Sequence, residues 1–387
     1  MYLVLVHLKS CGNGVADDTA AFAAADLAAA GRSVLVSAGT YFLAGTVTFE
    51  NAVRFEGTVS MSAASRLICR RNYDLDTYAA AFGSELEGFR RALQSLFYFN
   101  DHVTLDLSGR RVLLTAPIDV AAISGQTSFA QRRVLTNGQL EAVAGTAWDT
   151  TTVTSVGTYS VAQPTRLTAV ANVANVPVGA RVSGTGVGRE VYVLSKDVGG
   201  ATVELSQPLW AAAGTRTFTF DRYKYLLDFS GFSTLSKFEI TNMELNCAGS
   251  ASAIMLAKQG LTFRLADSVI NKPKDRGISS IGEGCQGIFV DQCQFLSNEQ
   301  TLPSQNRTSI AMNVNANDAK IRNNRVVRFA HFAVISGTGN VILGNHFFQG
   351  DDETAGVRRA GIIFTSTNLK TLMTGNYIDN SFIEWSN

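Results

Sequence analysis

The chain has 387 residues, of which 46% are hydrophobic, so it is long enough for one large domain or two ordinary ones with a sizeable core. Its 33 basic and 32 acidic residues leave a formal net charge of +1, which gives no reason to expect nucleic acid or an anionic membrane as a partner. The cysteines are odd in number and lack CxxC spacing, which argues against a disulfide framework or a structural zinc site and predicts buried, reduced thiols at Cys11, Cys69, Cys247, Cys285 and Cys293.

The opening segment MYLVLVHLKSC is predicted to form a strand rather than a signal peptide. Its apolar run ends at Val6, and Lys9 interrupts the approach to Cys11, whereas an export signal needs a longer apolar core. No later segment holds the roughly 18 consecutive apolar residues of a membrane-spanning helix, so membrane insertion is not expected.

The segment GNGVADDTAAFAAADLAAAG, residues 12–31, predicts a short helix. Asp17 or Asp18 is suited to cap its positive end by accepting backbone N–H bonds, and Gly31 is a plausible stop. The following SVLVSAGTYFL, residues 33–43, predicts a strand, a turn and a second strand.

A second helix is predicted over Tyr78–Phe97, in YAAAFGSELEGFRRALQSLF. Large apolar residues recur there at the spacing of one helix face. They are Phe82, Leu86, Phe89, Leu93 and Phe97. This amphipathic helix is expected to pack on a body built from strands.

The composition of the chain changes over residues 146–222, where Thr, Val and Gly are frequent. This segment is predicted to form a small inserted β domain of short Thr- and Val-rich strands with Gly turns. The insertion divides the chain into three parts. Residues 1–145 would hold the N-terminal cap and first coils, and residues 223–387 would hold the later coils.

From residue 238 onward one unit recurs, a strand, a polar turn residue and a second strand, as in FEITNMEL, GIFVDQCQF and AKIRNNRVV. Self-similarity at this period indicates a solenoid, and the unit predicts an all-β, right-handed parallel β-helix whose stacked coils share one core. Asn at the repeated corner can stack its amide on the next coil and tolerate a left-handed turn. The aligned corner residues are Asn242, Asp267, Gln292, Asn324, Asn345 and Asn376.

The N-terminal helix motif, the strand pair after it and the coils together resemble the pectate-lyase-like superfamily. GNGVADDTAAFAAAD followed by AGTYFL is similar to the N-terminal pattern of that superfamily. NDHVTLDLSGRRVLLTAPIDV and the last coil, NYIDNSFIEWSN, resemble its spike-type members, the phage tailspikes and the head spikes of gene-transfer-agent particles.

The resemblance implies handling of long polysaccharides, through hydrolysis, lyase cleavage, epimerisation or binding alone. It implies a phage or phage-like particle spike, made in the bacterial cytoplasm and carried on the virion or particle surface, that binds a capsular or exopolysaccharide outside the cell. A homotrimer and other particle proteins would be its partners. The alternative is a free depolymerase, a glycoside hydrolase or a polysaccharide lyase.

The two ends of the chain depart from the spike pattern. Spike proteins usually continue beyond their coils into a cap or trimerisation region, whereas this chain stops at Asn387. The first residues replace an expected lead-in rich in aspartate and glycine. We therefore expect a misplaced start, and either a truncated C-terminus or a partner that covers the last coil, because an open coil exposes unpaired backbone groups.

The best candidate for chemistry is the loop QGDDETAGVRRAG, residues 349–361. Asp351, Asp352 and Glu353 crowd three acids together, and their repulsion would keep one carboxyl group protonated as a general acid. Glycoside hydrolysis needs such a pair of carboxyl groups. Arg358 and Arg359 are suited to bind an acidic sugar.

Three further residues are candidates for substrate binding. Asp275 and Arg276, in NKPKDRG, are predicted to lie in a basic loop that contacts an anionic glycan, and His331 is predicted in a coil strand. The calcium of pectate lyases would need several aspartates on consecutive coils, a pattern this sequence lacks, so no metal and no cofactor is expected.

Overall fold

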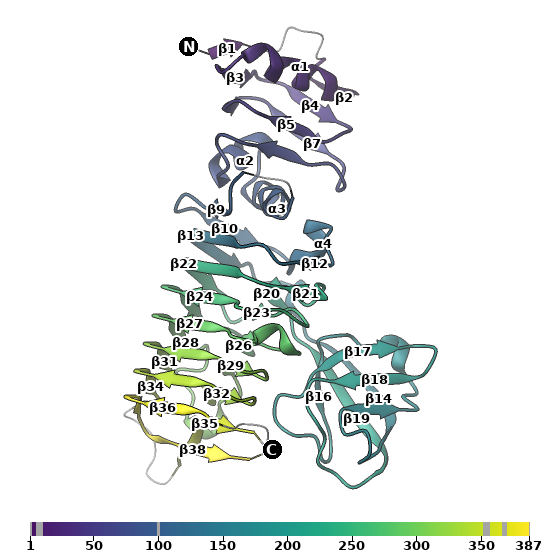
Figure 1. The fold of residues 1–387 in the computed structure, drawn as a ribbon, viewed down its shortest axis with the longest axis vertical. Helices are drawn as coiled ribbons and strands as arrows, with labels where there is room; N and C mark the ends of the chain where they lie inside the picture. The colour runs from purple at the N-terminus through teal and green to yellow at the C-terminus, as the bar shows by residue number, and fades with distance from the viewer. Residues whose placement is uncertain (1, 5–10, 99–100, 351–356, 366–369, 387) are drawn as a thin grey trace.

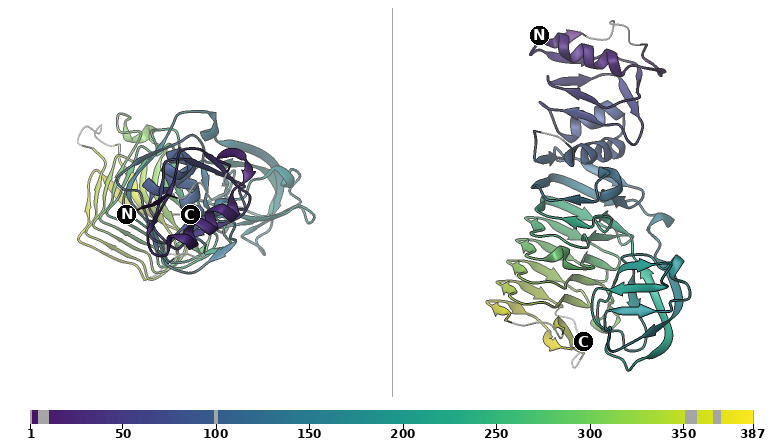
Figure 2. Two further views of the ribbon diagram at one scale, coloured as in Figure 1. Left: turned by 90° about the horizontal axis from the view of Figure 1, so that it is seen from above. Right: turned by 45° about the vertical axis from the view of Figure 1, so that its right-hand side comes forward.

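A computed structural model describes residues 2–4, 11–98, 101–350, 357–365 and 370–386. The chain winds into a long stack of coils, with the N-terminus at one end and the C-terminus near the other (Figure 1). A separate small sheet lies beside the later coils, as the turned view in Figure 2 also shows. Within the described ranges, no helix has the length and apolar character needed to cross a bilayer.

The first coils are built from short parallel strands. The predicted N-terminal strand is confirmed by β1, which pairs with β3. The ladders are β1 (Tyr2–Val4), β3 (Ser33–Val36) and β6 (Val53–Phe55); β2 (Asn13–Asp17), β4 (Thr40–Leu43) and β7 (Thr58–Met61); and β5 (Val47–Phe49) with β8 (Leu67–Cys69).

The helix α1 (Thr19–Ala29) lies at the N-terminal end of the stack, where Figure 1 shows it across the first strands. Asp18 occupies the N-cap position, but its carboxylate accepts the backbone N–H of Cys11 at 2.9 Å instead of a helix N–H. Asp17 accepts the backbone N–H groups of Thr19 at 3.0 Å and Ala44 at 3.1 Å, which ties the helix start to the coil. The pair therefore anchors the end of the stack.

The predicted helix over 78–97 is wrong in one respect, because the structure divides this region into α2 (Leu75–Phe82) and α3 (Glu85–Leu96). Gly83 ends α2 in the left-handed region at φ 62°, and the Ser84 hydroxyl accepts the Glu87 N–H at 3.3 Å to begin α3. Gly88 lets the helices touch, since a Cβ there would lie 2.6 Å from the Ala79 nitrogen.

The middle of the stack connects the helical layer to the later coils. Its longest strand, β13, pairs in parallel with strands on both sides. The elements are β9 (Thr104–Asp106), β10 (Arg111–Leu114), β11 (Ile118–Asp119), α4 (Val120–Ser124), β12 (Ser128–Phe129), β13 (Arg133–Ala142) and the short helix η1 (Thr146–Trp148).

The later coils repeat with each strand paired in parallel to its counterpart one coil on, which confirms the predicted all-β, right-handed parallel β-helix. One face holds β20 (Tyr225–Asp228), β23 (Ser252–Met255), β26 (Arg276–Ser279), β29 (Ile310–Val314), β32 (His331–Ile335), β35 (Arg359–Phe364) and β38 (Ser381–Trp385).

The other two faces meet at β22, which runs through both of them. These faces hold β22 (Phe238–Asn246), β24 (Arg264–Ala266), β25 (Val269–Asn271), β27 (Phe289–Asp291), β28 (Gln294–Leu296), β30 (Lys320–Arg322), β31 (Arg325–Val327), β33 (Val341–Leu343), β34 (His346–Phe348), β36 (Leu372–Thr374) and β37 (Tyr377–Ile378), with the short helices η3 (Glu283–Cys285) and η4 (Ser304–Asn306) in the turns. The short strand β21 (Thr234–Leu235) pairs separately with β12.

The corner between these two faces shows that the predicted alignment mixed two positions. Asn242, Asp267 and Gln292 adopt positive φ, and the next coil places Asn323, not Asn324, in this left-handed position. The residue after the corner points inward. There the Asn345 side chain accepts the Asn324 backbone N–H at 3.0 Å, and Asn376 does the same for Asn345. The predicted amide stacking is confirmed at this second position.

Residues between β13 and β20 form one antiparallel sheet beside the coils, which we call the insert. It has a hydrophobic cluster of its own, centred on Leu167, Val203 and Phe220, whereas a single cluster runs through the stack from Phe22 to Phe364. The insert holds β14 (Thr151–Tyr159), β15 (Arg166–Thr168), η2 (Val173–Asn175), β16 (Arg181–Ser183), β17 (Val193–Asp197), β18 (Thr202–Leu205) and β19 (Gly214–Arg222).

The insert packs on the stack through a small buried cluster in which its Tyr192 meets Tyr223, Tyr225, Met255 and Ile281. All five cysteine thiols are free, and four of them are buried, as predicted. The predicted burial of Cys11 is wrong, because its thiol is exposed. The docking of insert against coil creates the site described next.

Candidate functional site

A polar hollow of about 160 Å³ lies where the insert meets the sheet of β26, β29, β32 and β35. We call it the arginine cleft. Its charged and titratable lining residues come from both bodies and are Arg181, Arg189, Glu190, Arg276, Arg307, His331 and Arg359. The insert supplies the first three, and the coils supply the others.

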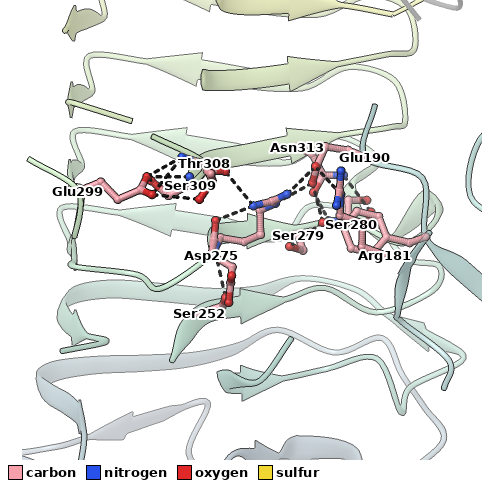
Figure 3. Close-up of polar contacts among 12 residues, drawn as sticks. Arg181, Glu190, Ser252, Asp275, Ser279, Ser280, Glu299, Thr308, Ser309 and Asn313 are labelled. Atoms are coloured by element: carbon pink, nitrogen blue, oxygen red, sulfur yellow. Dashed lines mark hydrogen bonds and ion pairs between the residues drawn. The ribbon is translucent and has the colours of Figure 1, made fainter. Parts of the chain in front are cut away.

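Glu190 and Arg276 form the centre of the cleft wall. Arg276 Nε and Nη2 donate to the two carboxylate oxygens of Glu190 at 2.9 and 2.8 Å, in a bidentate pair. Both residues are buried, with relative exposures of 4% each. Tyr192 donates its hydroxyl to the same carboxylate at 2.6 Å, and Arg181 Nε lies 3.5 Å from it. Figure 3 shows Glu190 and Arg181 together on the insert side of this network.

This network determines the charges of its members. Burial by itself would raise the pKa of Glu190, but the positive charge and hydrogen bonds of Arg276, with the charge of Arg181, lower that pKa to about 2. Burial works against the charge of Arg276, yet Glu190 raises the pKa of Arg276 well above its ordinary value. Both groups are therefore ionised at neutral pH.

Arg276 is also held from the coil side. Its Nη1 donates to the backbone carbonyl oxygens of Asp275 at 2.8 Å and Thr308 at 3.4 Å. The Glu299 carboxylate accepts the backbone N–H groups of Thr308 at 2.9 Å and Ser309 at 2.8 Å, which fixes that turn (Figure 3). The guanidinium group of Arg276 is thus occupied by the protein itself.

Arg307 and Arg359 line the side of the cleft that the coils form, and backbone carbonyl groups hold both side chains. Arg307 is buried and donates from Nη1 to the Gln349 backbone carbonyl at 2.9 Å. Arg359 Nη1 donates to the backbone carbonyls of Ser304 at 3.1 Å and Arg307 at 2.9 Å. These bonds orient both side chains around the η4 turn.

Some guanidinium donors remain available for a ligand. Within the described ranges, the two amino groups of Arg181 and the Nε and Nη2 groups of Arg359 have no hydrogen-bond acceptor in the protein. Arg189 is partly occupied, because its Nη2 lies 2.9 Å from Glu384 and its Nε 3.2 Å from Ser386. Since Arg181 and Arg359 both line the hollow, they can donate to an anion within it.

His331 begins β32 and lies in the cleft lining. Its Nδ1 is 2.7 Å from the backbone carbonyl oxygen of Ala360, so Nδ1 carries the proton and Nε2 is the acceptor in the neutral ring. Burial lowers the pKa of His331, and the positive charges of Arg359 and Arg189 act in the same direction. The imidazole is therefore neutral at pH 7.

The structure brings together three of the residues singled out from the sequence, Arg276, His331 and Arg359. The loop position predicted for Arg276 is wrong, because it begins β26 and is buried against Glu190. Asp275 lies beside it, and burial raises the pKa of its carboxyl group. Arg358 is exposed and does not line the cleft.

The acids predicted as catalytic, Asp351, Asp352 and Glu353, lie outside the described residues. The sequence reasoning missed Arg181, Arg189, Glu190 and Arg307. The only sequence signal for Arg189 and Glu190 was the pair of charges in GREVYV within an otherwise Thr- and Val-rich insertion. Arg181 lies outside that motif and gave no signal of its own. Arg307 gave no periodic signal, because it lies in a loop between coils.

Two further hollows are larger but less suited to a specific ligand. One, of about 350 Å³, lies between α3 and α4 and has mainly apolar walls, where Arg91 is occupied by Glu87 at 2.6 Å. The other, of about 460 Å³, lies shallowly over the coil corners and has mixed charges that include Arg111, Glu244 and Asp267. Neither gathers charge of one sign as the arginine cleft does.

Comparison with known proteins gives only a distant likeness. No protein-family model matches the chain. No curated protein matches it either. Among solved structures, the mannuronan C-5 epimerase AlgE6 A-module of Azotobacter vinelandii is 11% identical, with coverage of 99% of this chain and 89% of that one and a TM-score of 0.27.

Two other solved structures have similarly low sequence identities and TM-scores. The endo-xylogalacturonan hydrolase from Aspergillus tubingensis is 8% identical, with 100% and 93% coverage and a TM-score of 0.21. The surface protein and adhesin PfbA of Streptococcus pneumoniae is 9% identical, with 100% coverage of both chains and a TM-score of 0.26. Likeness at this level transfers no activity, so function has to be argued from this chain's own residues.

Proposed function

We propose that the protein binds an acidic polysaccharide of a bacterial surface in the arginine cleft. The observation that carries this proposal is the charge of the lining. Among the described residues, five arginines and one carboxylate, that of Glu190, line the hollow, while the whole chain is nearly neutral. Such an excess of one sign in a hollow attracts a ligand of the opposite sign, and arginine forks match the shape of a carboxylate.

The shape of the molecule supports a polymer as the ligand. The lining of the cleft includes strands of a long stack of parallel coils, and this stack continues beyond them (Figure 1), which gives a chain of sugars further coils to contact. The stack also repeats its strands in register, and repeated sugar units suit repeated shallow contacts. The resemblance of the N-terminal motif to the pectate-lyase-like superfamily points to the same class of ligand.

Binding is tested by titrating the protein with a polyuronate and with a neutral glucan of similar length. We expect binding of the polyuronate only, weakened by added salt because charges at the cleft mouth are screened. Arg181→Ala is expected to weaken binding by roughly 10-fold or more, since a hydrogen bond to a charged group contributes about 1.5–3 kcal/mol. Arg181 contacts no backbone carbonyl among the described residues, so the fold should persist.

Arg54→Ala is the matched control, because Arg54 is an exposed arginine of β6 in the first coils. It should bind as the unmodified protein does. Equal affinity for the neutral glucan, or an Arg181→Ala variant with unchanged affinity, would contradict the proposal.

We further propose that the protein is a spike of a phage or phage-like particle, carried on the particle surface as a homotrimer. This role rests on the resemblance of the N-terminal motif and last coil to spike-type proteins. Light scattering of the purified chain tests the trimer, and immunogold labelling of particles tests the location. A monomeric protein absent from particles would leave a free polysaccharide depolymerase as the alternative.

Hydrolysis is a second candidate activity. Asp351, Asp352 and Glu353 precede β35, and the first residue of β35, Arg359, lines the cleft. New reducing ends after incubation with the bound polysaccharide would support cleavage, and a polymer of unchanged length would exclude it.

A further inference from the structure

Two ion pairs cross the boundary between the insert and the coils, and they differ in burial. Glu190 of the insert pairs with Arg276 of β26 at 2.8 Å, and these side chains are 4% and 5% exposed. Arg189, the preceding residue of the insert, pairs with Glu384 of β38 at 2.9 Å, and these side chains are 36% and 29% exposed. The first pair is sealed inside the wall of the cleft, whereas the second pair is open to solvent.

Arg189 contacts the last coil through one edge of its guanidinium group. Its Nη2 donates to the Glu384 carboxylate at 2.9 Å, and its Nε donates to the Ser386 hydroxyl at 3.2 Å. The Ser386 hydroxyl donates in turn to the same carboxylate. This hydrogen bond and then the positive charge of Arg189 lower the pKa of Glu384, so its carboxylate is ionised at neutral pH. We call the contact of Arg189 with Glu384 and Ser386 the latch.

Arg189 also lines the arginine cleft, as Arg181 and Arg359 do. Those two arginines keep guanidinium donors that no acceptor among the described residues takes, whereas Nε and Nη2 of Arg189 are both engaged by the last coil. Glu384 offers Arg189 a carboxylate, which is the same chemical group that an acidic sugar offers. The last coil therefore holds one arginine of the site with a substitute for the ligand.

The exposure of the latch makes its ion pair replaceable. Water screens both charges of a half-exposed pair, so separating them costs little, and Glu384 can be solvated once Arg189 leaves it. Separating Glu190 from Arg276 would instead leave buried charges without partners. An anion that enters the cleft can thus take Arg189 from Glu384 while the wall of the cleft stays intact.

We propose that Glu384 regulates the arginine cleft as an internal competitor, which holds Arg189 until an acidic polysaccharide displaces it. This inference rests on the binding function proposed above and adds the last coil to that site. Because the polysaccharide and Glu384 compete for the same guanidinium group, the affinity is reduced by the cost of opening the latch. The latch thereby keeps the affinity of the cleft below the value that its arginines alone would give.

The latch is tested by isothermal titration calorimetry of the full chain with polygalacturonate, alginate and hyaluronan. Glu384→Gln keeps the size of the side chain and removes its charge, so we expect the tightest-bound polymer to bind roughly 2- to 5-fold more tightly, the range of an exposed ion pair. Glu56→Gln is the matched control, because it removes an exposed acid of the first coils and should leave the affinity unchanged.

Unchanged or weaker binding by Glu384→Gln would overturn the inference while the binding function stands. An equal gain in Glu56→Gln would also overturn it, since the gain would then follow net charge and not the latch. If the unmodified protein and Glu384→Gln bind none of the three polymers, the proposed binding function fails and the latch fails with it.

A double-mutant cycle shows whether the gain depends on Arg189. In a protein that already carries Arg189→Gln, adding Glu384→Gln should give no further gain, because no guanidinium group remains to be released. The same gain with and without Arg189 would mean that Glu384 only repels the ligand, and this result would overturn the competition.

Ser386→Ala tests the same contact and keeps both charges. It removes the hydroxyl that Arg189 and Glu384 share, so it should raise the affinity in the same direction as Glu384→Gln but by less. Thermal unfolding followed by circular dichroism shows that each variant is folded before titration. Weaker binding by a fully folded Ser386→Ala protein would count against the latch.

Discussion

Glu190 is the residue on which the electrostatics of the arginine cleft depend. Its carboxylate contacts Arg276, Arg181 and Tyr192. Its backbone adopts the left-handed region, at φ 52°. Without this carboxylate, the buried guanidinium group of Arg276 would have no charged partner. A buried charge without a partner destabilises a fold strongly, whereas a well-formed pair roughly balances its own desolvation.

We predict that Glu190→Gln lowers the free energy of unfolding at neutral pH by about 3 kcal/mol. The folded pKa of about 2 lies below the ordinary value of 4.5, and each unit corresponds to about 1.36 kcal/mol. Because the folded pKa is depressed, this contribution is present above about pH 4.5 and is lost as the pH falls toward 2. Urea unfolding of both proteins between pH 7 and pH 3 measures it.

The difference between the two proteins should therefore shrink at low pH. Glu56→Gln serves as the control, because Glu56 is an exposed acid paired with Arg54 at 3.4 Å. That substitution should change stability by less than about 0.5 kcal/mol. A gap between the unmodified protein and Glu190→Gln that stays constant from pH 7 to pH 3 would count against the assigned ionisation.

At the scale of single elements, the inward corner of each coil holds the stack in register. Asn345 is 1% exposed and joins three coils. Its Oδ1 accepts the backbone N–H and the side-chain N–H of Asn324, each at 3.0 Å, and its Nδ2 donates to the Ile321 carbonyl at 2.9 Å. Buried polar groups left without such partners are costly, so this position tolerates few residue types.

We predict that Asn345→Ala lowers the free energy of unfolding by about 2–4 kcal/mol, since the buried N–H of Asn324 and the carbonyl of Ile321 both lose a partner. The loss should appear locally as faster hydrogen exchange in the coil that holds Asn324 and in the next coil, which holds Asn345, because each coil of a solenoid contacts only its neighbours. Thr374→Ala, at an exposed position of β36, is the control. A change below about 0.5 kcal/mol for Asn345→Ala would show that the amide stack is dispensable.

At the scale of the whole molecule, the cleft exists because two separately packed bodies meet. The insert and the stack have distinct hydrophobic clusters, and the ends of the insert are adjacent because Thr151 pairs with Arg222. Because the insert has its own hydrophobic core and its two chain ends are adjacent, it can be removed with little disturbance to the stack.

We predict that replacing residues 151–222 with a short Gly-Ser linker, together with Arg276→Met, leaves the coil stack folded and abolishes binding of the acidic polysaccharide. The second substitution is needed because Arg276 would otherwise lose Glu190 and remain as an unpaired charge. Circular dichroism reports the stack, and titration with the polyuronate reports binding. Binding at full strength by the shortened chain would place the site elsewhere on the coils.

The fold was largely predictable because its signals are local. Polar corner residues such as Asn242 and Asp267 recur where the backbone turns to positive φ, and apolar residues alternate along the strands between them. Two errors were local as well. The helix boundary at Gly83 and Ser84 was missed because the apolar spacing runs across it, and the corner shifted by one residue at Asn324 because Asn323 precedes it.

The site was only partly predictable. Arg276, His331 and Arg359 were each recognisable as polar or charged residues in the coils, yet nothing in their separate segments shows that they share one hollow. That follows from parallel pairing of β26, β29, β32 and β35, which places residues far apart in sequence on neighbouring strands. Chain order and spacing do not encode such long-range contacts directly.

The sequence by itself determined that this chain is a coil stack with a capping helix and a different segment in its middle, because caps, corners and alternation act between near neighbours. Only the tertiary structure decided which arginines keep guanidinium donors for a ligand. Glu190 comes from the insert and occupies Arg276, 86 residues away, while Arg181 and Arg359 keep donors for a ligand. A charge's partner depends on docking across the cleft, and docking is a property of the folded molecule.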